Sequence, residues 1–94
     1  MITIETFRST GDDEALLAAD GQVQTDFYYQ QPGLARRTIA KADDGEWLVV
    51  TTWYSGEQAD DAGQSRGTSA AAAAFDQLID RSSYRTKRYE PLDR

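Results

Sequence analysis

The fold of this chain is decided by its most strand-prone segment, the eight residues Trp47-Leu48-Val49-Val50-Thr51-Thr52-Trp53-Tyr54. Aromatic and β-branched residues dominate the segment, and both kinds are enriched in strands. Side chains alternate between the two faces of a strand, so Trp47, Val49, Thr51 and Trp53 share one face. Because the other face is also largely apolar, we expect a central strand that is covered on both sides.

A charged segment and a tight turn precede this strand. Residues 34–42 carry Arg36, Arg37 and Lys41, as an edge strand exposed to water commonly does. The tripeptide Asp43-Asp44-Gly45 follows, and Asp-Gly between two strand-like runs is a strong hairpin signal. Residues 34–42 and 47–54 are therefore predicted to form an antiparallel hairpin.

Strand and helix signals alternate on both sides of the hairpin. The expected elements are a strand over residues 1–8, a helix from Asp12 to before Pro32, a short helical turn over 55–61, a loop over 63–67, a helix over 68–81 and a strand over 83–92. This β-α-β-β-α-β order predicts an α+β, ferredoxin-like fold, with two helices on one face of a four-stranded antiparallel sheet. The first and third strands are the apolar ones and should be central.

The opposite face of the sheet decides the expected assembly. Two helices shield one face only, and a bare apolar face is larger than monomers usually expose. A second copy packed sheet on sheet would cover it with the same patch used twice. We therefore expect a homodimer.

Composition excludes several classes of function. The 94 residues carry a net charge of −6 and contain neither cysteine nor histidine, which removes thiolate and imidazole chemistry and disulfides. The acidic balance argues against nucleic acid and membrane partners, although basic residues and tyrosines alternate over residues 84–89, as in a platform for single strands. Since no apolar run or basic leader marks a membrane span or signal peptide, a cytoplasmic location is expected.

Three segments carry a family resemblance: Gln31-Pro32-Gly33-Leu34, Asp43-Asp44-Gly45, and residues 48–57, in which a strand ends in Trp53 and Ser55-Gly56-Glu57 follows. In this order the chain resembles the antibiotic biosynthesis monooxygenase family, whose members have the dimeric α+β barrel fold. The resemblance covers nearly the whole chain and implies one such domain over residues 1–94. It also implies that Trp53 lies beside a ligand pocket between sheet and helices.

The resemblance further implies a cofactor-free monooxygenase or isomerase that binds a planar aromatic or polyketide-like molecule. The family's quinone-forming enzymes use an asparagine, and its haem-degrading members use an asparagine and a histidine, yet this chain contains neither residue. Haem degradation is therefore not expected, and we expect no cofactor and no metal. The alternative is a dimeric binding or assembly module without catalysis.

Several aromatic residues would line the implied pocket. Trp53, Thr51, Phe27 and Phe75 would meet in an apolar cleft suited to a flat aromatic ligand, if they do not simply form the core. The hydroxyl groups of Tyr28 and its neighbour Tyr29 would orient a phenol or a carbonyl, if they do not lie at the surface.

Charged residues complete the candidate site. Arg36 and Arg37 point to opposite faces of one strand, and Arg37, on the side of Ile39, would pair with an enolate or carboxylate unless it is an ordinary surface arginine. Asp20 falls on the apolar stripe of the first helix, where a buried carboxylate would suit proton abstraction. Because Gly21 follows, we expect the helix to break there and Asp20 to face water. The pairs Asp12-Asp13, Asp43-Asp44 and Asp60-Asp61 are interpreted as caps and turns rather than metal ligands.

Overall fold

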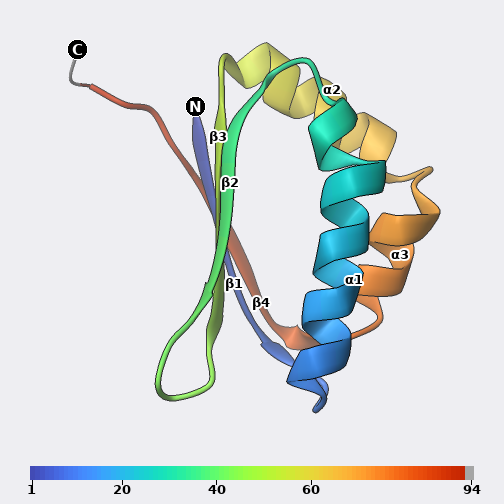
Figure 1. The fold of residues 1–94 in the computed structure, drawn as a ribbon. Coiled ribbons are helices and arrows are strands. Elements are labelled where there is room, and N and C mark those ends of the chain that lie inside the picture. Colours follow the sequence, from blue (N-terminus) through green and yellow to red (C-terminus); the bar gives the residue numbers. More distant parts are fainter. Residues whose placement is uncertain (93–94) are drawn as a thin grey trace.

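The computed structural model describes residues 1–92 and places one sheet against three helices (Figure 1). The elements are β1 (Ile2–Ser9), α1 (Asp13–Asp26), a 3₁₀ turn (Tyr28–Gln30), β2 (Leu34–Lys41), β3 (Trp47–Trp53), α2 (Gly56–Arg66), α3 (Ala70–Asp76) and β4 (Ile79–Tyr89). Residues 93 and 94, which the one-domain prediction includes, lie outside the described residues.

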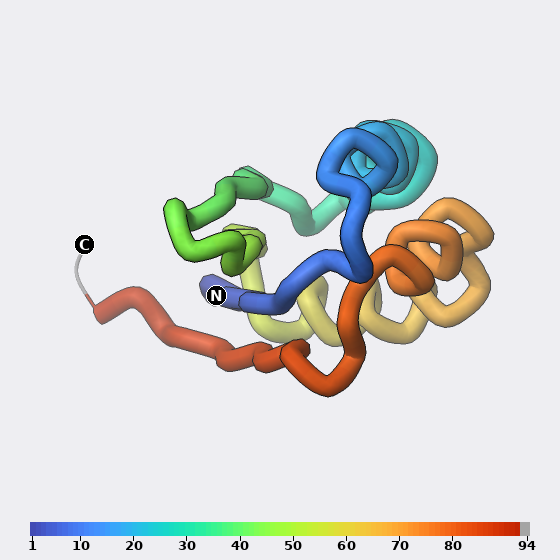
Figure 2. The backbone as a smooth tube through the Cα atoms, turned by 90° about the horizontal axis from the view of Figure 1, so that it is seen from below, coloured from blue at the N-terminus to red at the C-terminus, as the bar shows by residue number. Residues whose placement is uncertain are grey.

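The sheet has the strand order β2-β3-β1-β4, and every neighbouring pair is antiparallel. Figure 2 shows the strands nearly end-on in this order, with the helices gathered to one side. The predicted ferredoxin-like α+β fold is confirmed, as are the central positions of the first and third strands.

The predicted hairpin forms, with a turn that depends on glycine. Ala42 and Glu46 close it through a backbone hydrogen bond of 2.8 Å, and the Asp44 carboxylate accepts the Glu46 N–H at 3.0 Å. Gly45 has φ +93°, in the left-handed region that favours glycine. Asp44 therefore serves the turn, as interpreted from the sequence.

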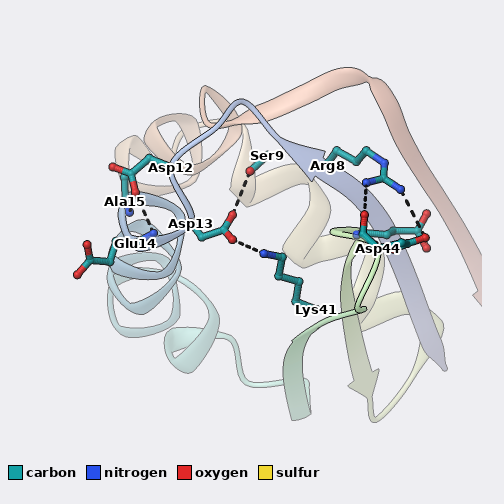
Figure 3. Close-up of polar contacts among 9 residues, drawn as sticks. Arg8, Ser9, Asp12, Asp13, Glu14, Ala15, Lys41 and Asp44 are labelled. Atoms are coloured by element: carbon teal, nitrogen blue, oxygen red, sulfur yellow. Dashed lines mark hydrogen bonds and ion pairs between the residues drawn. The ribbon is translucent and has the colours of Figure 1, made fainter.

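The start of α1 is fixed by side chains that the sequence also indicated (Figure 3). Asp12 caps the helix by accepting from the backbone N–H groups of Glu14 and Ala15 at 3.0 and 3.2 Å. The carboxylate of Asp13 accepts a hydrogen bond from Ser9 and forms an ion pair with Lys41 of β2. The ion pair ties helix α1 to β2, the edge strand of the sheet.

Helix α1 ends earlier than predicted. Its regular part stops at Asp26, and the 3₁₀ turn carries the chain to Gln30 before Pro32. Gly33 is needed at the following turn because a Cβ there would lie 2.3 Å from the Cβ of Gln58 in α2. At this turn the chain therefore approaches α2 closely.

The second crossover departs most from the prediction. Helix α2 runs through Gly63 to Arg66, where a short turn and a loop were expected, and α3 stops at Asp76 instead of residue 81. Ser55 caps α2, and the burial of Ala59 and Ala62 against the sheet offsets the low helix propensity of Gly63. Beyond α3, Ile79 pairs with Ser9 of β1 and is buried, so strand pairing ends the helical run.

The two faces of the sheet differ in cover. On the helix side Trp47, Val49, Thr51 and Trp53 are all buried, as their alternation predicts. On the other side Leu48, Val50 and Thr52 remain half-buried, next to Ile2 and Ile4 of β1. Figure 1 shows no helix of the described residues on that side of the sheet. These half-buried side chains therefore form an uncovered apolar stripe.

Candidate functional site

A cavity of about 540 Å³ lies on the helix side of the sheet, between β1 and β4 and the helices α2 and α3. Its apolar wall consists of Phe27, Trp53, Ala59, Ala62 and Ile79. The ring of Tyr28 joins this wall and lies edge-on to Phe27, with centroids 4.9 Å apart, and 6.4 Å from Trp53. The wall is large enough and aromatic enough to hold a fused-ring compound.

Tyr28 lies between two arginines. On the cavity side the Nε of Arg66 donates to the phenolic oxygen at 3.1 Å. On the far side the guanidinium of Arg37 stacks over the Tyr28 ring, 4.5 Å from its centroid. The phenol ring is thus held in place from both directions.

Arg66 also forms a two-pronged ion pair with Asp76 at the start of the link to β4. Its Nη1 and Nη2 donate to the two carboxylate oxygens at 2.7 and 2.8 Å. The hydrogen bonds that Arg66 donates to Asp76 raise the pKa of Arg66 further above its ordinary value, which keeps the guanidinium charged. This pair joins the ends of α2 and α3 and lines the cavity.

A carboxylate and a second phenol meet across the strands opposite Arg66. Tyr84 of β4 donates its O–H to Oε2 of Glu5 in β1 at 2.7 Å, and both residues line the cavity. Burial, with the nearby charge of Glu5, raises the pKa of Tyr84 above its ordinary value. Tyr84 therefore stays protonated and keeps donating to Glu5.

The prediction that Asp20 faces water is wrong. Helix α1 continues unbroken through Gly21, and Asp20 is 2% exposed between the buried Leu16 and Val23. Its Oδ1 lies 2.8 Å from Nη2 of Arg37, and its Oδ2 accepts from Gln24 at 2.6 Å. The cation that reaches across from β2 makes burial of this acid tolerable.

The alternative of Arg37 as a surface residue is wrong as well. Its side chain is 2% exposed, and it lies behind Tyr28 without lining the cavity. Its Nε and Nη1 have no hydrogen-bond partner within residues 1–92. Arg36, by contrast, is exposed, on the side of the sheet away from Arg37.

The remaining predicted site residues divide into two groups. Trp53, Phe27 and Tyr28 line the cavity together. Thr51 and Phe75 do not, because Thr51 is buried in the sheet and Phe75 packs edge-on against Phe7 with centroids 6.0 Å apart. Tyr29 is 65% exposed and donates to Gln24.

The polar half of the cavity was not predicted from the sequence. Glu5, Arg66 and Asp76 were not singled out, and Tyr84 was considered only within the alternating run of residues 84–89. The basic residues Arg81, Lys87 and Arg88 also line the cavity. One signal was present for Glu5, which has the same strand parity as the buried Phe7. Arg66 fell in a segment expected to be a loop, so its position could not be inferred.

Residues 1–92 contain neither a cluster of metal-ligating side chains nor a helix that could span a membrane. No group of three or more His, Cys, Asp or Glu side chains in this part of the chain could hold a metal ion. None of its helices is both long and apolar enough to cross a membrane.

Comparison with known proteins rests on structure alone, since no protein-family model and no curated protein matches the sequence. A variant of SnoaB, a cofactor-independent oxygenase from Streptomyces nogalater, superposes with a TM-score of 0.82 at 16% identity, over 99% of this chain and 93% of that one. A protein from Chloroflexus aurantiacus named for the antibiotic biosynthesis monooxygenases gives 0.74 at 19% identity, over 98% and 92%.

The fold is that of the antibiotic biosynthesis monooxygenases. Tetracenomycin F2 cyclase from Streptomyces glaucescens, a type-II polyketide cyclase, shares it with a TM-score of 0.68 at 13% identity, over 100% of this chain and 99% of that one. At these identities the likeness shows a shared fold and nothing further. The same fold serves both an oxygenase and a cyclase.

Proposed function

We propose that residues 1–94 act as one domain that binds a planar aromatic or polyketide-like compound in the cavity beside Trp53 and oxidises or isomerises it without a cofactor. The cavity itself carries the proposal. It combines an aromatic wall of Phe27, Tyr28 and Trp53 with a polar side that holds Glu5, Arg66 and Tyr84. A flat compound with ring oxygens would match both halves. The polyketide cyclase with this fold supports this class of ligand, and the cofactor-independent oxygenase supports chemistry without a cofactor.

Ligand screening tests this proposal. A panel of flat phenols, quinones and naphthols is titrated against the protein, with tryptophan fluorescence and the melting temperature as readouts. Compounds that bind the native state raise its melting temperature, and a ligand at 100 times its dissociation constant adds about 2.7 kcal/mol. At least one member of the panel should shift both signals.

Trp53→Phe shows whether binding occurs at this cavity. The variant should fold. Its free energy of unfolding should fall by at most about 1–3 kcal/mol, because a cavity wall relaxes more easily than a packed core. The melting-temperature shift caused by the ligand should largely disappear. Trp47→Phe is the matched control, since Trp47 is equally buried but does not line the cavity, and ligand binding should survive there.

The proposal includes a homodimer that covers the bare face of the sheet. Half-buried Ile2, Ile4, Leu48 and Val50 form an apolar stripe there, and sheet-on-sheet packing about a two-fold axis would bury it twice. Replacing Val50 by Lys and Tyr54 by Asp should give monomers or insoluble protein in light scattering. The same pair of charges at two exposed positions, Ala74→Lys in α3 and Gln77→Asp at its C-cap, should leave the dimer intact. An unchanged dimer in the first variant would refute this interface.

A non-catalytic dimeric module is the second candidate, and the apolar stripe on the bare face favours it as much as it favours the enzyme. Ligand binding in the cavity distinguishes the enzyme from the module. If no compound of the panel shifts either signal, and Trp53→Phe costs as much stability as a fully buried tryptophan would, the enzyme is rejected in favour of the module.

A further inference from the structure

Two residues with carboxylates line the cavity, and only one of them has an oxygen that accepts no hydrogen bond within residues 1–92. Both oxygens of Asp76 accept from Arg66, at 2.7 and 2.8 Å. Glu5 accepts from Tyr84 through Oε2, while within residues 1–92 its Oε1 has no hydrogen bond or ion pair. Glu5 is therefore the proton acceptor available in the cavity. In a chain without histidine or cysteine, few other side chains can take this part.

The same cavity contains a hydrogen-bond donor that is free to serve a ligand. Tyr28 accepts from Arg66 through its phenolic oxygen, so its own proton points elsewhere. No acceptor for that proton is found in the described part of the chain. Arg66 is charged and held by Asp76, and its hydrogen bond makes the Tyr28 O–H a better donor to an oxygen that gains negative charge.

We propose that Glu5 and Tyr28 together enolise a carbonyl compound bound against the aromatic wall; this step rests on the function proposed above. The C–H bond on the carbon next to the carbonyl breaks, and its proton moves to Oε1 of Glu5. The electron pair moves onto the carbonyl oxygen, which receives a hydrogen bond from Tyr28. The step needs no oxidant, because the proton can return to the same carbon or to another. Tyr84 is a positioning residue that holds the Glu5 carboxylate.

Deuterium exchange isolates this step from any later chemistry. The probe is 2-tetralone, a small fused-ring ketone with an acidic C–H, incubated with the protein in D₂O without oxygen. Proton NMR follows the loss of the signal at that carbon, and the melting-temperature shift measures binding separately. The wild-type protein should bind the probe and accelerate exchange above the buffer rate.

Glu5→Gln is the decisive variant. The glutamine keeps the shape of the side chain and can still accept from Tyr84, so the fold and the dissociation constant should change little. Exchange at saturating probe should fall at least about 100-fold, as expected on loss of a general base. Glu57→Gln removes an exposed acid of α2 outside the cavity and should exchange like the wild type. Tyr84→Phe should slow exchange about 10-fold with an unchanged dissociation constant, because only the position of the base is disturbed.

The outcomes separate the two proposals. If the wild-type protein binds 2-tetralone but exchanges it no faster than Glu5→Gln does, the enolisation step is overturned and the aromatic ligand site stands. If neither 2-tetralone nor any compound of the aromatic panel binds the wild-type protein, the proposed function fails and this step fails with it.

Discussion

Two arginine–aspartate pairs flank Tyr28, and they differ in their access to solvent. The side chains of Arg37 and Asp20 are 2% and 3% exposed, behind the ring and away from the cavity. Those of Arg66 and Asp76 are 26% and 32% exposed and line the cavity. A third pair, Lys41 with Asp13, joins the same edge strand β2 to α1 at the surface, with 40% and 41% exposed.

This difference assigns the pairs to different tasks. A sealed pair meets no ligand, and its burial costs free energy that Coulomb attraction offsets only when both partners are present. The sealed pair therefore fixes how α1 and β2 pack together and holds Arg37 against the Tyr28 ring. A pair at a cavity wall remains partly hydrated, so its arginine can attract an oxygen of a ligand at small cost to the fold.

Breaking the sealed pair should have the largest effect. In Asp20→Asn the guanidinium of Arg37 stays buried without a counter-charge, and the free energy of unfolding should fall by about 3–5 kcal/mol. Urea denaturation of the variant and of the wild-type protein measures the difference.

The double variant Asp20→Leu with Arg37→Met sharpens this result. Apolar side chains of similar volume need no counter-charge, and replacing both partners of a buried pair is often neutral or stabilising. The double variant should therefore recover most of the stability that Asp20→Asn loses. A loss below about 1 kcal/mol in Asp20→Asn would mean that water reaches the pair and that it resembles the one at the cavity.

Removing the arginine at the cavity wall should cost less stability and more function. In Arg66→Met the half-exposed Asp76 can be hydrated, so the free energy of unfolding should fall by only about 1–2 kcal/mol. The affinity for an oxygen-bearing aromatic ligand should fall about 10-fold, because Tyr28 loses its charged partner. Urea denaturation and ligand-induced melting shifts measure the two effects.

Arg8→Met is the control for this variant. Arg8 forms an exposed ion pair with Asp44 in the hairpin turn, outside the cavity (Figure 3). The affinity of Arg8→Met for the ligand should equal that of the wild-type protein. An equal loss of affinity in both variants would show that general charge, and not the Arg66 contact with Tyr28, attracts the ligand.

The local features of the fold were predictable from the sequence because neighbouring residues determine them. The Asp-Gly turn, the Asp12 cap and the alternation of residues 47–53 depend on backbone angles and on the two-residue period of a strand. The helical run after Ser55 was misjudged because Gly63 disfavours a helix by propensity, whereas the burial of Ala59 and Ala62 stabilises it.

The polar side of the site could not be predicted, because it depends on contacts between distant residues. Asp20 was expected to face water because Gly21 suggested a break in the helix, and no residue near it in the sequence indicates its partner Arg37. In β1 the alternation of Ile2 and Ile4 with Thr3 and Glu5 makes the isoleucines look like the buried side. The structure turns Glu5 toward the cavity and leaves the isoleucines on the bare face of the sheet.

Breaking the exposed ion pair between Lys41 and Asp13 should have the smallest effect on stability, and this effect should depend on pH. The hydrogen bond from Lys41 holds the pKa of Asp13 below its ordinary value. A carboxyl whose pKa is lower in the folded state contributes stability above its unfolded pKa of about 3.9, and this is lost as pH falls through the folded pKa. Lys41→Met should therefore be slightly less stable than the wild-type protein at pH 7, with a smaller difference near pH 2.5.

The ammonium group of Lys41 also lies 5.6 Å from the Trp47 ring, a contact that does not titrate in acid. Urea denaturation of both proteins, alone and combined with Asp13→Asn, separates the two contributions: a difference that is independent of pH and survives Asp13→Asn would assign the effect to Trp47 and remove the ion pair from the comparison.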